Sequence, residues 1–140
     1  MPDKILYTAH ATATGGREGV AASDDGRLSV TLSTPKALGG NDGPGTNPEQ
    51  MFAAGYSACF LGALKFVARA AKLALPETTT VSGAVGIGPI PTGFGIQVAL
   101  TIAAPGVDKA ILEDLVAKAH VVCPYSNATR GNIQVDLAVA

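Results

Sequence analysis

The chain has 140 residues, of which 47% are hydrophobic and 15% charged, and its formal net charge is −1. A charged share well below the usual ~25% excludes an intrinsically disordered chain. The absence of a basic excess excludes an electrostatic binder of nucleic acid or of an anionic membrane surface, so we expect neither as a partner. The length fits a single domain over residues 1–140.

The first third of the chain predicts β-structure. Short strands separated by Gly-rich turns are expected at residues 4–14, 19–23 and 27–33. The sequence Asp24-Asp25-Gly26 is typical of a hairpin turn between the second and third strands. A loop rich in Gly and Pro follows at residues 34–46.

A long helix is expected from Pro48 to about Leu75. Asn47 suits the N-cap, Pro48 the first helical position, and Gln50 completes a capping box. From Met51 to Val67 the sequence is apolar on nearly every face, which indicates a helix enclosed on all sides. A chain of this length can hardly enclose such a helix alone, so we expect a partner subunit.

We expect neither a membrane-spanning helix nor a signal peptide from the sequence. The apolar stretch 51–67 is short and interrupted by Gly and polar residues, so it predicts a core helix rather than a membrane span. The N-terminal sequence MPDKILYTAH lacks the apolar region of a signal peptide. We therefore expect a cytoplasmic protein, where two cysteines are more often catalytic or redox-active than a permanent disulfide.

The remainder of the chain predicts two strands, a second helix and a last strand. These are expected at residues 78–87, 94–103, 108–123 and 132–139. Asp108 suits the N-cap of the second helix, and Cys123-Pro124 ends it. Its apolar stripe consists of Ile111, Leu112, Leu115, Val116 and Ala119. The order βββ-α-ββ-α-β lacks a regular βαβ alternation, so the fold class is α+β with an antiparallel-rich sheet around the long helix.

The two cysteines are the main candidates for chemistry. Each alone is most simply a buried core thiol. However, Cys59 lies in the central helix and Cys123 precedes a proline at the end of the second helix. If the two approach each other, they form a dithiol pair.

A reactive cysteine must be a thiolate, which apolar burial disfavours. Cys59 lies about three turns into its helix, beyond the useful range of the helix dipole. Lowering a thiol pKa from ~8.5 to ~6 needs roughly 3.4 kcal/mol, and one guanidinium at ~4 Å supplies about that much at an effective dielectric of ~20. Arg17, on a Gly-flanked turn, is the first candidate, and Arg130 is the fallback.

Glu49 is a candidate to orient such an arginine, because carboxylates bind guanidinium groups in a bidentate manner. As a first-turn residue it also simply complements the helix dipole. Glu49 and Cys59 are about 15 Å apart on a straight helix. They can share a site only if the helix breaks near Gly55 or if one of them comes from a neighbouring subunit. His120 and Cys123 resemble half of a metal site, but no second pair exists, so we expect no metal.

Three motifs carry a family resemblance. They are TGGR at residues 14–17, TNPEQMFAAGYSACF at residues 46–60 and CPYSNATRGN at residues 123–132. Together they resemble the organic hydroperoxide resistance (Ohr) branch of the OsmC/Ohr family, over almost the whole chain. The resemblance implies an OsmC/Ohr-like fold and an intertwined homodimer with two sites near the subunit interface.

The resemblance also implies an activity. It implies a thiol peroxidase with Cys59 as the peroxidatic and Cys123 as the resolving cysteine, and with Arg17 and Glu49 as the charged pair beside the thiolate. Organic hydroperoxides would be preferred over hydrogen peroxide. The disulfide would be reduced by dihydrolipoyl groups on a lipoylated protein, without a bound cofactor.

The apolar helix offers candidate substrate contacts. Met51, Phe52 and Phe60 could line a slot for an alkyl chain, which would favour alkyl hydroperoxides by ~0.8 kcal/mol per buried CH₂. Ordinary core packing explains the same side chains equally well.

Three alternatives remain open from the sequence. A carrier of small apolar ligands or acyl chains would use the helix as a pocket and need no thiol chemistry. A thiol oxidoreductase acting on protein disulfides would be expected to carry a C-x-x-C motif, which is absent. A structural dimer module would hold both thiols buried and inert.

Overall fold

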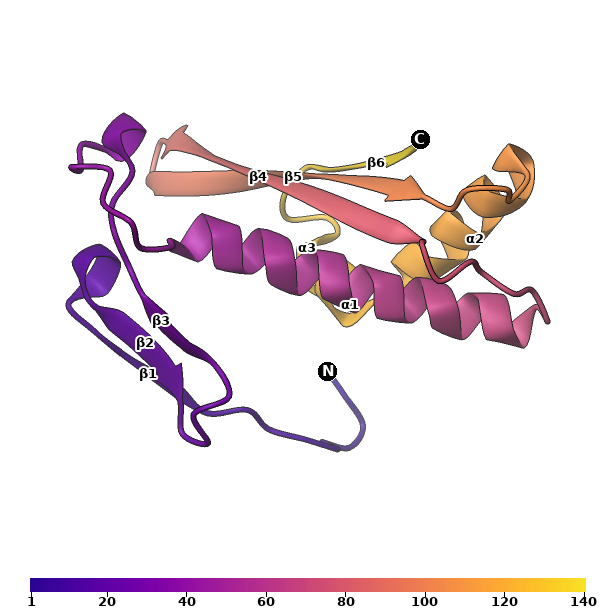
Figure 1. Ribbon diagram of the computed structural model, residues 1–140, viewed down its shortest axis with the longest axis horizontal. Coiled ribbons are helices and arrows are strands. Elements are labelled where there is room, and N and C mark those ends of the chain that lie inside the picture. Colours follow the sequence, from indigo (N-terminus) through magenta and orange to yellow (C-terminus); the bar gives the residue numbers. More distant parts are fainter. The chain divides into compact units, whose positions relative to one another are not determined.

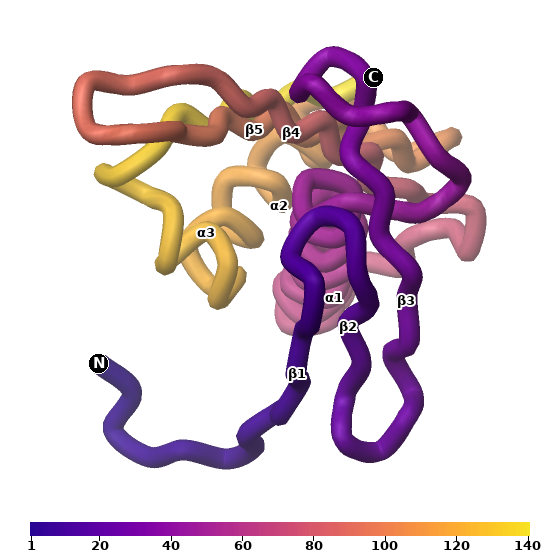
Figure 2. Tube along the Cα trace, turned by 90° about the vertical axis from the view of Figure 1, so that its left-hand side faces the viewer, coloured from indigo at the N-terminus to yellow at the C-terminus, as the bar shows by residue number.

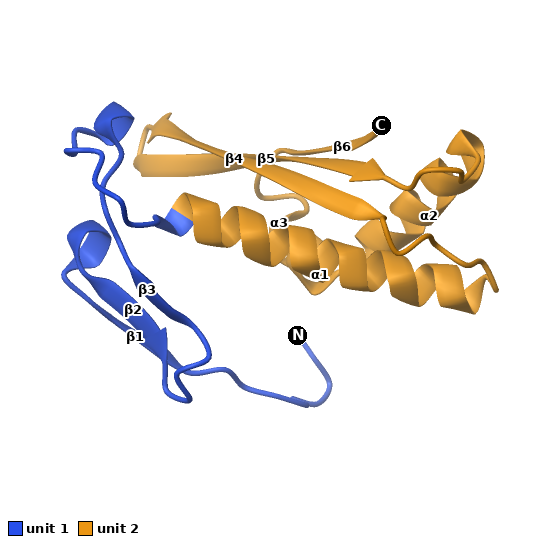
Figure 3. Ribbon diagram, in the orientation of Figure 1, with its two compact units in different colours: residues 1–48 blue, residues 49–140 orange.

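The computed structural model describes residues 1–140. Its elements are β1 (Ala11–Thr14), the 3₁₀ helix η1 (Gly16–Glu18), β2 (Val20–Ser23), β3 (Ser29–Thr31), the 3₁₀ helix η2 (Lys36–Leu38), α1 (Pro48–Ala70), β4 (Thr80–Ile90), β5 (Gly93–Ala103), α2 (Lys109–Val122), α3 (Pro124–Thr129) and β6 (Val135–Val139) (Figure 1). The chain divides into two compact units, residues 1–48 and 49–140 (Figure 3). The expectation of one domain stays a prediction.

The first unit is a three-stranded antiparallel sheet in the order β1-β2-β3. Its second turn is built around Asp25, whose carboxylate accepts hydrogen bonds from the Ser23 hydroxyl at 2.6 Å and the Arg27 backbone N–H at 3.0 Å. The predicted hairpin is therefore confirmed. The strands are shorter than expected, because pairing begins only at Ala11 in β1 and at Ser29 in β3.

The second unit contains a sheet in the order β4-β5-β6, in which β4 and β5 are antiparallel and β5 and β6 are parallel. Ile90 pairs with Gly93, so only Pro91 and Thr92 connect the two long strands, where the sequence predicts a longer loop. Gly93 has a φ of 147°, which favours glycine at this tight connection. The α+β class with mainly antiparallel pairing is confirmed.

Helix α1 ends at Ala70 rather than at the expected Leu75. Lys72 adopts a left-handed backbone with a φ of 57°. The N–H of Leu73 then bonds the carbonyl of Ala68, and the N–H of Lys72 bonds that of Arg69. This pair of bonds is a Schellman motif, which ends the helix before Pro76 is reached.

One face of α1 forms the core of the second unit. Tyr56, Phe60 and Leu64 are fully buried, whereas Phe66 is 65% exposed. A single chain therefore leaves part of α1 uncovered, as expected, and its enclosure by a partner subunit stays a prediction. Strand β4 crosses α1 closely, since a Cβ added at Gly83 would lie 2.6 Å from the Ser57 Oγ. Figure 2 looks nearly along α1, with β4 and β5 lying across it.

Helix α1 also bears on the prediction of a core helix in place of a membrane span. At 23 residues it is long and apolar enough to cross a membrane by length and composition alone, although the apolar stretch 51–67 was expected to be too short. A core helix passes the same test, and the fully buried face of α1 identifies it as one. No membrane span is indicated.

Helix α2 begins as predicted, because the Asp108 carboxylate accepts a hydrogen bond from the Ile111 N–H at 3.2 Å. Most of its predicted stripe is buried, but Ile111 is 43% exposed, since it lies on the neighbouring face of the first turn. The short helix α3 was not predicted. It begins at Pro124, whose fixed φ suits a first helical position, and it changes the expected order to βββ-α-ββ-αα-β.

Candidate functional site

The structure brings the two cysteines together. The Sγ atoms of Cys59 and Cys123 lie 3.6 Å apart, although the residues are 64 positions apart in the sequence. Both thiols are free, and Cys59 is partly exposed whereas Cys123 is fully buried. A disulfide needs an S–S distance of about 2.05 Å, so a small movement separates this dithiol from a disulfide. The expectation that the two cysteines approach each other is confirmed.

A break between two helices positions Cys123. Its N–H bonds the Ala119 carbonyl as the last bond of α2, and its carbonyl accepts a hydrogen bond from Asn127 as the first bond of α3. Between these bonds its backbone is extended, with a φ of −65° and a ψ of 123°. The thiol is therefore held on a short, doubly anchored corner beside α1.

The surroundings of Cys59 in this unit disfavour its charged form. Burial raises the pKa of the Cys59 thiol, and the neighbouring Cys123 thiol raises it further. A hydrogen bond from the Tyr125 backbone N–H to the sulfur opposes both effects and lowers this pKa. The net effect is a raised pKa of Cys59, so a Cys59 thiolate at neutral pH needs a nearby cation, as expected from the sequence.

Sequence reasoning missed the Tyr125 N–H. The signal was present, because Cys123-Pro124 begins a helix and the first N–H groups of any helix have no partner within it. One of these donors is directed at Cys59.

Arg17 lies in η1 of the first unit. Gly15 precedes it with a φ of 74° and Gly16 has a φ of 58°, so the predicted Gly-flanked turn is confirmed. The Thr34 hydroxyl donates to the Arg17 carbonyl at 3.5 Å and ties the turn to the chain that follows β3. The pairing of its guanidinium with Cys59 stays a prediction.

Arg130, the fallback cation, contacts other groups. Its guanidinium donates one hydrogen bond to the Asn127 Oδ1 at 2.7 Å and another to the His120 carbonyl. It therefore links the carbonyl end of α2 to α3 on either side of Cys123. Burial lowers the pKa of His120, the charge of Arg130 lowers it further, and the His120 Nδ1 is buried without a hydrogen-bond partner.

Glu49 lies in the first turn of α1. The helix runs unbroken through Gly55 to Ala70, so the proposed break near Gly55 is wrong, and Glu49 lies about 15 Å along the helix from Cys59 of the same chain. Only the second alternative, a contribution from a neighbouring subunit, remains as a prediction.

The three candidate substrate contacts differ in exposure. Phe60 is fully buried in the core cluster, so core packing explains it within one chain. Met51 and Phe52 are half-buried. The Phe52 ring centre lies 6.1 Å from that of Tyr56 and 6.0 Å from that of Tyr125. Contact of Met51 and Phe52 with a substrate stays a prediction.

The fold and the site together define a class of protein. A free dithiol with one partly exposed sulfur is held between the core helix and a helix junction of an α+β unit, and such a pair of thiols is chemically suited to thiol–disulfide redox reactions. Among residues 1–140 no three His, Cys, Asp or Glu side chains lie together as a metal-binding group.

Comparisons with known proteins identify the family. Residues 39–138 match the model of OsmC-like proteins. The organic hydroperoxide resistance protein of Xanthomonas axonopodis pv. citri is 66% identical, over 99% of this chain and 98% of the relative. The chain belongs to the OsmC/Ohr family, and to its organic hydroperoxide resistance branch, as the motifs predicted.

Solved structures agree with this assignment. An organic hydroperoxide resistance protein of Legionella pneumophila is 48% identical, with a TM-score of 0.92 over 98% of this chain and 99% of the other. A similar protein of Vibrio cholerae, solved with captopril bound in one of its active sites, is 46% identical, with a TM-score of 0.93 over 99% of this chain and 95% of the other.

Proposed function

We propose that the chain is a cysteine-based peroxidase that reduces organic hydroperoxides, such as alkyl and fatty-acid hydroperoxides, to alcohols. The observation that carries the proposal is the 3.6 Å separation of the Cys59 and Cys123 sulfurs. The relatives named for organic hydroperoxide resistance support the choice of substrate class.

The first step oxidises Cys59. Its thiolate attacks the distal oxygen of ROOH, the O–O bond breaks, and the alkoxide takes a proton and leaves as ROH. Cys59 is then a sulfenic acid. Arg17 stabilises both the thiolate and the charge that develops on the leaving oxygen. This role supplies the cation that the raised pKa of Cys59 requires.

The second step closes the disulfide. The Cys123 thiol attacks the Cys59 sulfenic sulfur, an S–S bond forms, and water leaves with the sulfenic oxygen. The 3.6 Å starting distance makes this step fast enough to compete with further oxidation to the sulfinic acid. An external dihydrolipoyl dithiol on a lipoylated protein then reduces the disulfide in two exchange reactions and becomes a disulfide itself. No bound cofactor is needed.

The proposal includes a homodimer in which the partner chain supplies Glu49 to the site. Phe66 on α1 is 65% exposed and Phe94 at the start of β5 is 75% exposed, and contact with a partner chain would remove such large apolar side chains from water. The Vibrio cholerae relative has more than one active site. We place the protein in the cytoplasm, without nucleic-acid or membrane partners.

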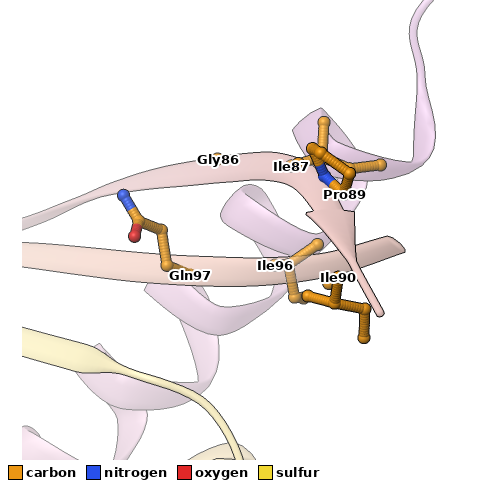
Figure 4. Close-up of a pocket in the computed structure, with 8 residues that line it drawn as sticks. Gly86, Ile87, Pro89, Ile90, Ile96 and Gln97 are labelled. Atoms are coloured by element: carbon orange, nitrogen blue, oxygen red, sulfur yellow. The ribbon is translucent and has the colours of Figure 1, made fainter. Parts of the chain in front are cut away.

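An apolar-ligand or acyl-chain carrier is the second candidate. A cavity at the tip of the β4–β5 hairpin is lined by Ile87, Pro89, Ile90 and Ile96, with Gln97 at its edge (Figure 4). Neither cysteine contributes to this cavity. A carrier would therefore keep its binding and its biological effect after the substitution Cys59→Ser.

Rapid mixing tests the proposal. Reduced protein is mixed with cumene hydroperoxide and, separately, with hydrogen peroxide, and the products are analysed by mass spectrometry. We expect fast oxidation by the organic peroxide, slower oxidation by hydrogen peroxide, and one Cys59–Cys123 disulfide within a chain. An unmodified Cys59 after exposure to the organic peroxide would exclude a peroxidase.

A further inference from the structure

Three hydroxyl groups form a buried cluster between α1 and α3. The Tyr56 Oη lies 2.8 Å from the Ser126 Oγ and 3.1 Å from the Thr129 Oγ1. Tyr56 and Ser126 are fully buried, and Thr129 is 6% exposed. These hydrogen bonds between hydroxyl groups join the helix of Cys59 to the short helix that follows Cys123.

The cluster lies one helical turn from each sulfur. Tyr56 precedes Cys59 by three residues on α1, and Ser126 follows Cys123 by three residues. Residues three apart on a helix are neighbours on one face. A shift of α3 against the Tyr56 phenol would therefore move Cys123 relative to Cys59, and with it the Tyr125 N–H that donates to the Cys59 sulfur.

The cluster also contacts the backbone of α3, because the Thr129 hydroxyl donates to the Ser126 carbonyl at 3.3 Å. In the contacts of the Tyr56 hydroxyl with Ser126 and with Thr129, either oxygen can be the donor. One phenol on α1 thus bonds two hydroxyls of α3, and this pair of bonds holds the short helix against α1.

Helix α3 needs this external anchor. It has six residues, and a helix of that length is not stable by itself in water. Arg130 ties α3 to α2, but it does not contact α1 through any hydrogen bond that the structure records. The hydroxyl cluster is therefore a direct link between α3 and α1, beside the ring contacts that Tyr125 makes with Phe52 and Tyr56.

We propose that Tyr56, Ser126 and Thr129 are positioning residues for disulfide closure: they hold Cys123 within reach of oxidised Cys59 before the Cys59 sulfenic acid is oxidised further. The proposal rests on the proposed function and extends it to residues outside the cysteines and the charged pair. Positioning two reacting groups raises their effective concentration, and its loss slows the reaction without changing the groups themselves.

The test separates the two chemical steps. Tyr56→Phe keeps the ring and its contacts with Phe52 and Tyr125 but removes the hydroxyl. Each protein is mixed with cumene hydroperoxide and quenched at intervals with dimedone, and mass spectrometry measures sulfenic acid, disulfide and sulfinic acid. We expect an unchanged rate of Cys59 oxidation, disulfide closure slowed about tenfold, and more sulfinic acid at excess peroxide.

Three further variants keep the test independent of folding. Thr129→Val removes the hydroxyl at nearly constant shape and should also slow closure, whereas Thr129→Ser keeps the hydroxyl and should restore it. Thr79→Val removes another buried hydroxyl of the same unit, which bonds the Pro76 carbonyl at 2.6 Å, and should lower stability without changing the closure rate.

The outcomes distinguish the inference from the proposed function. Closure in Tyr56→Phe and Thr129→Val at the wild-type rate or faster, with unchanged sulfinic acid, would overturn the inference while leaving the peroxidase intact. Equal slowing in Thr79→Val would also overturn it, because general destabilisation would then explain the effect. Failure of the wild-type protein to form the disulfide would instead contradict the proposed function itself.

Discussion

Gly55 on α1 lies directly against the side chain of Tyr125 on α3: a Cβ added at Gly55 would lie 3.1 Å from the Tyr125 Oη. The glycine, which the sequence suggested as a helix break, instead allows the two helices to approach within an unbroken α1. Because the N–H of Tyr125 also donates to the Cys59 sulfur, this close contact helps to define the surroundings of the thiol.

The contact predicts a coupling between Gly55 and Tyr125. Alanine at a helix position ordinarily stabilises the folded protein by up to ~1 kcal/mol relative to glycine. At Gly55, however, the new methyl group would lie in tight contact with the Tyr125 phenol. We expect Gly55→Ala to give no stabilisation in the wild-type protein and a gain in a Tyr125→Phe background, with a coupling of about 1 kcal/mol. Denaturant unfolding of the four proteins measures it, and additive effects would contradict the contact.

The unequal settings of the two sulfurs predict unequal roles. Cys59 is partly exposed and Cys123 is fully buried, so peroxide reaches Cys59 first. We expect Cys123→Ser to consume the first equivalent of cumene hydroperoxide like the wild-type protein but to form no disulfide and to consume further peroxide as its sulfenic acid becomes sulfinic acid. We expect Cys59→Ser to consume none. The peroxide consumed per chain in the absence of a reductant measures this. A full first turnover by Cys59→Ser would reverse the assignment.

The raised pKa of Cys59 predicts a pH profile for Arg17→Ala. Without the guanidinium, burial keeps the thiol protonated to a higher pH, and only the thiolate reacts. The oxidation rate of the variant should therefore be lower at pH 7 and should still rise above the ordinary thiol pKa of ~8.5, whereas the wild-type rate should level off at lower pH. Stopped-flow oxidation between pH 5 and 10 measures this.

Arg27→Ala is the matched control for that experiment. Arg27 belongs to the same unit, but its side chain is 90% exposed and pairs with Asp25 at the hairpin turn. Its profile should coincide with that of the wild-type protein. If the pH profile of Arg17→Ala also coincides with the wild-type profile, Arg17 is not the cation that stabilises the Cys59 thiolate.

The distance along α1 predicts that Glu49 acts across the dimer. Glu49→Gln should slow oxidation of Cys59 by loosening Arg17. In a mixed dimer of Glu49→Gln and Cys59→Ser chains, a Glu49 that acts across the interface leaves one site complete, so activity should exceed that of the Glu49→Gln dimer. Co-expression with two affinity tags isolates the mixed dimer. Activity that does not exceed that of Glu49→Gln would show that Glu49 acts within its own chain.

His120 predicts a loss of stability at acid pH. In the folded state, burial and the charge of Arg130 lower the pKa of His120 below its ordinary value of 6.5. The folded state therefore favours the neutral ring. The resulting stability is fully present above about pH 6.5 and is lost as the pH falls below it, because the unfolded chain then binds the proton first. The free energy of unfolding should fall less between pH 7 and 5 in His120→Gln than in the wild-type protein. An equal or larger fall in the variant would contradict this.

The sequence by itself determined the local features that depend on near neighbours. The start of α1 at Pro48, the Asp108 cap, the hairpin at Asp25 and the Gly-flanked turn at Arg17 follow from residue types at short spacing. The three motifs also determined the family, which the comparisons confirm. The end of α1 was misplaced, since a left-handed Lys72 is not required by its residue type.

Only the tertiary structure decided how the two thiols meet. Their separation of 3.6 Å, the Tyr125 N–H on Cys59 and the Tyr56 hydroxyl cluster join segments more than sixty residues apart, and no local pattern encodes such contacts. The same applies to α3, which bonds Tyr56 on α1 and is linked to α2 by Arg130. Packing across long loops sets these distances, because its free energy depends on the assembled surfaces rather than on neighbouring residues.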